Sequence, residues 1–362
     1  MNQNPQLPDH LRLIRSQGIG PVSYRRLLER FGTPAAALDA IPDLARRGRG
    51  RPPRLASHAD AMREIEAVAV LGARHVVMGD ADYSPLLAEI EDAPPVLSVK
   101  GDVSLFQRSA VAMVGARNAS AAACRLAREL AAGLGREGQA VVSGLARGVD
   151  SAAHDGSIST GTIAVIAGGI DVTYPPENEA RQADIAERGL LVAEMPPGTR
   201  PTARHFPHRN RIIAGLAAGT LVVEAAPRSG SLITARLAGE MGREVMAIPG
   251  SPLDPRARGC NGLIRDGATL IQDVEDVLTL LRPLDDRMAR VAEPPAPAPH
   301  PQPEPDEAAS RRVEQLLGPV AVGVDELIRQ SGLSAPEVQL VLLELDLAGR
   351  LDRHAGGRVS LR

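Results

Sequence analysis

Aromatic residues are scarce in this sequence, since they make up 2% of its 362 residues and tryptophan is absent. A binding surface built from many stacked rings is therefore excluded. The two cysteines, Cys124 and Cys260, lack the spacing of a disulfide framework or a zinc site. No apolar run reaches the roughly 18 residues of a membrane span, and the N-terminus lacks the basic and then apolar order of a signal peptide. We expect a cytoplasmic protein with no bound metal and no membrane association.

Lysine is nearly absent too, because Lys100 is the only one among the 41 basic residues. The net charge of −3 predicts no polyanionic partner, so nucleic-acid binding would require local clustering of arginines. An apolar content of 44% is ordinary for a chain that buries real cores, and the length suffices for two or three domains.

The first region, residues 1–88, is expected to be a helical domain. A glycine-containing turn over residues 18–20 precedes an amphipathic stretch with Leu27, Leu28 and Phe31, and a second helix is expected to start near Thr33. This order resembles a helix-hairpin-helix, or SAM-like, domain, whose turn can offer backbone N–H groups to a phosphate. A single copy serves a structural role more often than a DNA contact.

The second region, residues 89–282, alternates short apolar runs with helical patterns from about residue 109. Near-continuous apolar strands separated by helices predict a parallel sheet that is covered on both faces. The fold class is therefore α/β, with a doubly wound parallel-sheet (Rossmann-like) core. The expected strands are AVAMVG, AVVSG, TIAVIAGG, LLVAE, TLVVEA and EVMAIPG.

Two further regions complete the chain. Residues 283–309 are rich in proline and are expected to form an extended linker. Residues 310–362 show the order helix, helix, helix and two short strands, which predicts a C-terminal winged helix. The third helix carries Glu337, Glu344 and Asp346 but no lysine or arginine. Because phosphate contacts need cations, we favour protein contact over duplex DNA for this domain.

The turns after the strands are the places where an open parallel sheet binds ligands. Neither the GxGxxG dinucleotide fingerprint with its acidic residue nor the GxxxxGK[ST] phosphate loop occurs, so we expect no nucleotide cofactor and no ATP hydrolysis. Small residues and arginines follow the strands instead. These candidates are Gly115, Arg117, Ser143, Gly144, Arg147, Ser229, Gly230 and Ser231.

The stretch RHFPHRNRIIAGLA, residues 204–217, places cations where a helix begins. Helix N-termini already carry partial positive charge, so Arg204, Arg209 and Arg211 are unfavourable there unless an anion binds. Several N–H-rich turns and arginines at one edge of the sheet exceed the needs of one phosphate. A run of phosphates would match them, which predicts single-stranded nucleic acid, with Phe206 stacking on a base.

Each feature also has a purely structural interpretation. Glycines are needed in tight turns, and serines can cap helices without any ligand. Arg209 or Arg211 could pair with Glu194 or Glu224 at neighbouring strand ends. The coincidence of several such turns with the arginine cluster nevertheless favours binding.

At these residues the sequence resembles the DNA processing protein A family (DprA, also called Smf). The matching stretches are MVGARNAS, VVSGLARGVDSAAH, IAVIAGGIDVTYPPEN, AEMPPGTRPTARHFPHRNRIIAGL, VVEAAPRSGSLITARLAGEMGREVMAIPGS and GCNGLIRDGA. The resemblance implies a non-enzymatic protein that binds and protects incoming single-stranded DNA and loads the RecA recombinase onto it in natural transformation. It also implies a homodimer formed through the α/β domain.

The resemblance further implies a set of DNA contacts. Many family members have Gly-Ser-Arg where this chain has Ala116 before Arg117, so a hydroxyl donor is missing here. Members often carry lysine near the cluster, where this chain has Arg204. The implied contacts are Arg117, Ser143, Gly144, Arg204, Phe206, Arg209, Asn210 and Arg211.

Two other functions remain open. One is a nucleotide-processing enzyme of related fold, although the PGGxGTxxE turn of nucleoside-monophosphate-cleaving families is missing and no activated nucleophile replaces it. The other is a regulator that binds duplex DNA through the winged helix.

Overall fold

The computed structural model describes residues 4–288, 306–354 and 356–362. The described residues fall into two compact units. One comprises those of Met1–Arg63 and Pro295–Arg362, and the other those of Glu64–Pro294. Within the described ranges, no helix combines the length and the apolar character that a membrane span requires.

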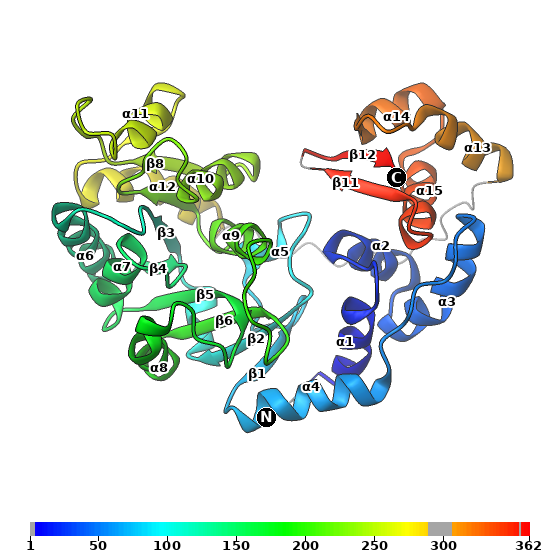
Figure 1. Cartoon of the computed structure of the whole chain (residues 1–362), viewed down its shortest axis with the longest axis horizontal. Coiled ribbons are helices and arrows are strands. Elements are labelled where there is room, and N and C mark those ends of the chain that lie inside the picture. The colour runs from blue at the N-terminus through cyan, green and yellow to red at the C-terminus, as the bar shows by residue number, and fades with distance from the viewer. Residues whose placement is uncertain (1–3, 289–305, 355) are drawn as a thin grey trace. The chain divides into compact units, whose positions relative to one another are not determined.

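A nine-stranded sheet forms the centre of the Glu64–Pro294 unit, in the order β1-β2-β6-β5-β4-β3-β7-β8-β9 (Figure 1). All neighbours from β6 to β9 are parallel, and β2 and β1 extend the β6 edge with antiparallel pairing. The predicted doubly wound core is confirmed. The strands are β1 (Arg74–Val77), β2 (Val96–Gly101), β3 (Ala110–Val114), β4 (Ala140–Ser143), β5 (Thr162–Gly169), β6 (Leu190–Met195), β7 (Gly219–Val222), β8 (Glu244–Ala247) and β9 (Thr269–Leu270).

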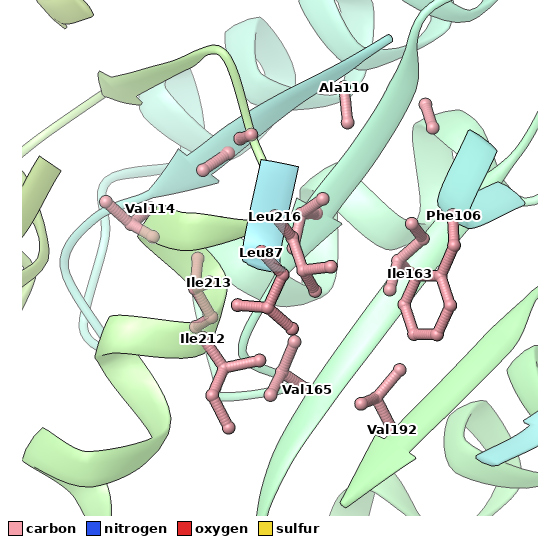
Figure 2. Packing of buried hydrophobic residues seen from close by; sticks show 14 of the residues in the cluster. Leu87, Phe106, Ala110, Val114, Ile163, Val165, Val192, Ile212, Ile213 and Leu216 are labelled. Atoms are coloured by element: carbon pink, nitrogen blue, oxygen red, sulfur yellow. The ribbon is translucent and has the colours of Figure 1, made fainter. Parts of the chain in front are cut away.

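Helices cover both faces of this sheet, which explains why β3, β4 and β5 are apolar or buried at every position. On one face, Ile212, Ile213 and Leu216 pack with Leu87 and Val165 (Figure 2). This face carries α5 (Pro85–Ala88), α9 (His205–Gly215), α10 (Ser231–Glu240) and α11 (Arg258–Arg265). The other face carries α6 (Ala121–Arg136), α7 (Val149–Ser157), α8 (Glu179–Arg188) and α12 (Val274–Met288).

The strand order changes direction at β3. From β3 the chain adds β4, β5 and β6 on one side, and α9 then returns it to β7 on the other side of β3. The loops that leave β3 and β7 therefore diverge to opposite faces of the sheet. Such a switch point opens a crevice at the carboxyl ends of the strands, where ligands of open α/β sheets bind.

The other unit combines the N-terminal helices with a winged helix. The predicted glycine turn and the predicted second helix start are present, because Gly18 has φ +76° and Thr33 caps a helix by accepting a hydrogen bond from Ala36 N. Helices α1 (Leu7–Arg15), α2 (Pro21–Phe31) and α3 (Pro34–Arg47) form the N-terminal part, followed by α4 (His58–Val70), within which the two units divide. The winged helix consists of α13 (Glu307–Leu316), α14 (Val324–Ser331), α15 (Ala335–Leu347) and the sheet of β10 (Val322–Gly323), β12 (Arg358–Leu361) and β11 (Leu351–His354).

The third helix of the winged helix, α15, packs against α3 of the same unit. The approach is so close that a Cβ atom on Gly48 would lie 2.1 Å from the carbonyl oxygen of Glu344. Asp346 accepts hydrogen bonds from Ser23 (2.6 Å) and Arg353 (3.0 Å). Two of the acidic residues that argued for protein contact, Glu344 and Asp346, thus meet the N-terminal helices of the chain itself, whereas Glu337 accepts a hydrogen bond from Ser334 at the start of its own helix.

Two predictions about domain limits differ from the structure. The region predicted as helical up to residue 88 contains β1, so the predicted boundary at 88/89 lies inside the sheet-bearing unit. The segment Arg74–Val77 is a short edge strand that begins with two polar residues, so it shows no periodicity. The linker predicted from residue 283 overlaps α12, which continues to Met288. Residues 289–305 lie outside the described residues, so their extended form stays a prediction.

Candidate nucleic-acid interface

A cavity of about 630 Å³ lies at the switch point and is called here the main cavity. Its wall is formed by the turn after β3, the turn after β4, α9, and the turn after β7. Four of the segments that the sequence placed at one edge of the sheet therefore do come together. The predicted site residues that line it are Gly115, Arg117, Phe206, Arg209, Asn210, Ser229, Gly230 and Ser231.

Gly115 is required at this point by close packing. A Cβ atom there would lie 2.5 Å from a methyl carbon of Val149 and 3.1 Å from the carbonyl oxygen of Glu224. The next residue, Ala116, donates its N–H to that same oxygen at 2.7 Å. The β3 turn is thereby fixed between α7 and β7, and it directs Arg117 into the cavity.

Arg117 and Phe206 form a cation–π pair. The guanidinium carbon of Arg117 lies over the ring of Phe206, 5.0 Å from its centroid. Tyr174, which precedes η2 (Pro176–Asn178), packs against the same ring with a centroid separation of 5.6 Å and an interplanar angle of 56°. Phe206 thus already contacts two side chains of the protein.

Arg209 is buried at the base of the site, beside Gly144 and Asp150. Burial lowers the pKa of Arg209 to about 10, against the opposing effect of Asp150, and burial also raises the pKa of Asp150 above its ordinary value. Desolvation is the largest cause for both groups, so the carboxylate compensates the guanidinium only in part. The buried Nε of Arg209 has no hydrogen-bond partner among the described residues. Arg209 is also among the residues that line the main cavity.

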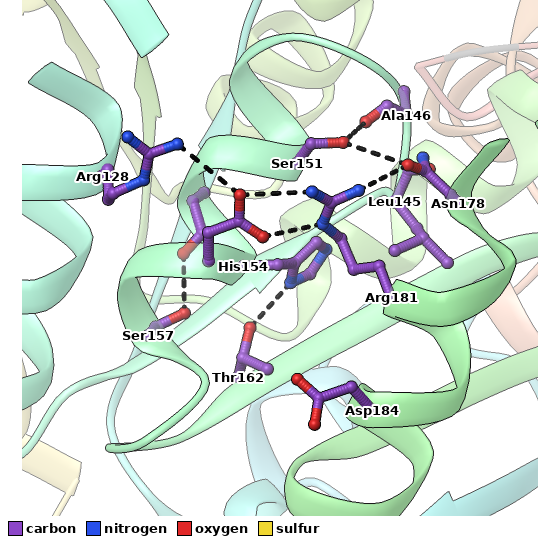
Figure 3. Close-up of polar contacts among 12 residues, drawn as sticks. Arg128, Leu145, Ala146, Ser151, His154, Ser157, Thr162, Asn178, Arg181 and Asp184 are labelled. Atoms are coloured by element: carbon purple, nitrogen blue, oxygen red, sulfur yellow. Dashed lines mark hydrogen bonds and ion pairs between the residues drawn. The ribbon is translucent and has the colours of Figure 1, made fainter. Parts of the chain in front are cut away.

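The turn between β4 and α7 is held in an unusual conformation. Leu145 is buried and has φ +54°, a region that costs a branched side chain about 1–2 kcal/mol. Asn178 donates to the carbonyl oxygen of Leu145 at 2.8 Å, and Ser151 donates to that of Ala146 (Figure 3). Arg181 in turn donates to the side-chain oxygen of Asn178 at 2.6 Å. This network fixes the backbone beside Gly144 and Arg147.

A smaller cavity of about 30 Å³ adjoins this turn. It is lined by Gly144, Arg147, Tyr174 and Arg209, together with residues that also face the main cavity. Arg147 is exposed and lies 3.5 Å from Glu177, which is also exposed. Such a surface pair is weak, so Arg147 stays accessible to another anion.

Two predicted contacts lie elsewhere and are corrected. Arg211 is buried and pairs with Glu194, and its Nε also lies 3.4 Å from Asp92. Two residues along a helix correspond to about 200° of rotation, so Arg211 points away from the side that Arg209 faces. Ser143 is fully buried and donates its hydroxyl to the carbonyl oxygen of Met113 at 2.7 Å. Neither side chain lines the main cavity or the smaller one.

Arg204 is exposed at the first turn of α9 and lines neither cavity. The serines at the start of α10 bond to each other, with 2.7 Å between the hydroxyls of Ser229 and Ser231. Neither α9 nor α10 has an acidic residue in its first turn or a side-chain cap. Both helix N-termini therefore keep their partial positive charge.

The carboxylates near the site are largely engaged elsewhere. Glu224 accepts hydrogen bonds from the N–H (3.0 Å) and the hydroxyl (2.7 Å) of Ser120 at the start of α6, and Glu194 pairs with Arg211. By contrast, Arg117, Arg204 and Arg228 form no ion pair with any carboxylate of the described residues. Within the part of the chain that the structure describes, Asp150 is the one carboxylate that lines the main cavity, so the positive potential of the site is compensated only in part.

Three family models together match most of the chain. Residues 74–282 match the model of the family described as DNA recombination-mediator protein A. Residues 5–67 match a DprA-like N-terminal HHH domain, and residues 294–357 match a DprA winged helix domain. The chain belongs to the DprA family.

Members of the DprA family are similar to this chain over most of its length. It is 47% identical over 194 residues to the DNA processing protein DprA of Streptococcus pneumoniae, covering 53% of this chain and 68% of that protein. It is 37% identical to the protein Smf of Escherichia coli, covering 80% of this chain and 78% of the relative. The solved DprA of S. pneumoniae superposes with a TM-score of 0.64 at 34% identity, over 77% of this chain and 98% of that chain.

A second solved structure is the DprA of Helicobacter pylori, described for its single-stranded DNA binding mode. It is 27% identical with a TM-score of 0.53, over 59% of this chain and 96% of that chain. Both structures support the α/β fold of the DprA family for this chain.

Sequence reasoning missed four residues of this DprA-family site. Arg228 could have been found, since it directly precedes Ser229 in a turn already singled out. Tyr174 lies in the segment between β5 and η2 and was passed over, although it is exposed and lines the smaller cavity. Asp150 and Asn178 gave no signal, because each acts through a three-dimensional neighbour.

Proposed function

We propose that this chain binds single-stranded DNA along the carboxyl edge of its sheet, with the phosphates at Arg117, Arg209 and Arg228. The observation that carries the proposal is the main cavity, where a buried guanidinium with an unpartnered donor lies beside two arginines that no described carboxylate neutralises. Phosphate oxygens are the acceptors that best match such forks.

The length of the basic edge supports a polymer rather than one nucleotide. Besides the main cavity, Gly144 and Arg147 line the smaller cavity, and Arg204 is exposed at the start of α9. Single strands carry one phosphate per nucleotide, so a chain of them can contact several of these groups in turn. We infer that Asn210, Ser229, Gly230 and Ser231 supply hydrogen bonds within the main cavity.

From membership of the DprA family we propose a more specific role for the bound strand. The bound strand would be protected and then passed to RecA in natural transformation or recombination, with a homodimer formed through the α/β domain. We propose no catalytic step, because Asp150 is the single carboxylate that lines the main cavity and no histidine or cysteine lines it. Hydrolysis would need a nucleophile and a base within reach of each other.

Duplex binding through the winged helix is the second candidate, and the contact of α15 with α3 argues against it. A recognition helix must enter the major groove, whereas this helix is packed on the N-terminal helices. Deletion of residues 289–362, which leaves α12 intact, would abolish DNA binding only if the winged helix carried it.

The test is a fluorescence-anisotropy titration of the full chain with single-stranded and duplex oligonucleotides at two salt concentrations. The proposal predicts tighter binding of the single strand and an affinity that falls as salt rises. Equal binding of both forms, or no binding, would refute it. A parallel assay for base release from nucleotides, and one for RecA filament formation on the coated strand, test the enzyme alternative and the RecA role separately.

A further inference from the structure

Tyr174 stands apart from the other aromatic residues of the chain. The sequence contains three tyrosines, three phenylalanines and no tryptophan, and of these Tyr174 alone is exposed, at 47% of its surface. The others are buried or half-buried. A single exposed ring is ordinary in itself. Its position is not ordinary, because it lines the smaller cavity beside Arg147 and Arg209.

The neighbouring ring, Phe206, is poorly placed to receive a base. Arg117 lies over it at 5.0 Å and Tyr174 packs against it at 5.6 Å. A base that stacked on the Arg117 side would have to displace a guanidinium. Phe206 therefore packs with both Tyr174 and Arg117, and the exposed aromatic ring of the site is that of Tyr174.

The segment that carries Tyr174 is restrained on its C-terminal side. Pro175 and Pro176 follow directly, and their rings fix two consecutive φ angles. Asn178 is buried and anchors η2 by its hydrogen bond to the carbonyl oxygen of Leu145. A ring held in this way loses little conformational freedom when it stacks on a ligand, so most of the stacking energy is available for binding.

We propose that Tyr174 stacks on an unpaired nucleobase of the bound strand and thereby selects single strands over duplexes. This inference rests on the proposed function. Arginines and helix N-termini recognise phosphates, which both forms of DNA carry, so they discriminate poorly between them. Only an unpaired base presents its face to a tyrosine.

The test combines two variants with two oligonucleotides. Tyr174→Leu removes the ring, and Tyr174→Phe keeps it as the matched control. One oligonucleotide is a normal single strand, and the other has the same length but abasic sites throughout, so that only the backbone remains. We expect Tyr174→Leu to bind the normal strand roughly 5- to 150-fold more weakly than the native chain, and Tyr174→Phe to bind it equally well.

The abasic strand separates stacking from a general structural effect. Tyr174→Leu and the native chain should bind it with the same affinity, because no base is present to lose. Equal loss on both strands, or no loss on the normal strand, would overturn the inference while leaving the proposed function intact. Failure of the native chain to bind either strand would instead overturn the proposed function, and this inference with it.

Intrinsic fluorescence gives an independent readout. The chain has no tryptophan, and Tyr24 and Tyr83 are buried. Tyr83 also donates its hydroxyl to the carbonyl oxygen of Pro94 at 2.7 Å. Tyrosine emission should therefore be quenched by the normal strand through Tyr174 alone. Quenching of the same size in Tyr174→Phe would contradict the assignment.

Discussion

The role of the buried Arg209 guanidinium can be tested by adding one carbon atom at the neighbouring Gly144. In Gly144→Ala, the new Cβ would lie 1.3 Å from Nη1 of Arg209, 2.5 Å from its guanidinium carbon and 2.8 Å from the carboxylate of Asp150. The backbone of Gly144 is not in the left-handed region, so alanine causes no strain there. All the close atoms belong to the ends of side chains. The substitution should thus expel the guanidinium from its seat without unfolding the domain.

The expected magnitude follows from the contact that is lost. One charge-assisted hydrogen bond contributes about 1.5–3 kcal/mol, which corresponds to roughly a 10- to 150-fold rise in Kd for single-stranded DNA. The slope of log K against log salt should become shallower by about 0.7 if one phosphate contact is lost. Stability should also fall, by at most about 3–5 kcal/mol, because Asp150 stays buried without its partner.

The assay is an anisotropy titration at four salt concentrations together with a thermal melt. Gly262→Ala is the matched control, since a Cβ at Gly262 meets no atom within 4 Å. The double variant Gly144→Ala/Arg209→Ala should bind no more weakly than Arg209→Ala alone. Native affinity and native slope in Gly144→Ala would refute the role of the seated guanidinium.

Two further predictions concern residues near the site, and a third concerns the unit that holds the winged helix. Asn178→Ala removes the hydrogen bond to Leu145, so we expect the free energy of unfolding in urea to fall by about 1–3 kcal/mol and DNA binding to weaken. Unchanged values would show that the turn keeps its conformation without this hydrogen bond. Burial lowers the pKa of His154 from 6.5 to about 3. As pH falls, His154 is therefore protonated in the unfolded chain before it is protonated in the folded one. The free energy of unfolding should fall as pH drops from 6.5 towards 3, by up to about 1.4 kcal/mol per pH unit. Urea unfolding at several pH values measures this loss, and His154→Gln should remove it. Gly48→Ala would drive a Cβ into the backbone of Glu344, so calorimetry should show the winged helix and the N-terminal helices melting separately, whereas one unchanged transition would contradict the tight contact.

The central sheet was predictable because its strands carry their own signal. Strands β3, β4, β5 and β7 are buried at every position, so almost every residue is apolar and each run is recognisable without its neighbours. β1 is only four residues long and begins with two polar residues, although three of the four are buried, so Arg74–Val77 gave no signal. The winged helix was predictable from element order alone.

The site was predictable as a set of turns but not as a set of side chains. Arg209 and Arg211 have the same chemistry and lie two residues apart. Which of them faces the cavity depends on how α9 packs on the sheet through Ile212 and Ile213. Glu194 could be named as a partner for either arginine, and only the fold shows that it takes Arg211.

Polar residues at strand ends are ambiguous for a related reason. Ser143 and Ser229 look alike in sequence, as hydroxyls beside glycines. The first satisfies a buried carbonyl oxygen of β3, whereas the second lies at the cavity wall. Ser143 is the last residue of β4 and Ser229 lies in the turn between β7 and α10, and the sequence alone does not show where each strand ends.

The central claim is that phosphates of a single strand contact the uncompensated arginines at the switch point. The most direct measurement is the salt dependence of single-stranded DNA binding for Arg117→Ala and Arg228→Ala. The control is Arg236→Ala, which removes an exposed arginine that lies 3.8 Å from Glu240 and lines neither the main cavity nor the smaller one. Each of the first two should lower the slope of log K against log salt by about 0.7, and the third should leave it unchanged. Three identical slopes, equal to that of the native chain, would contradict the account.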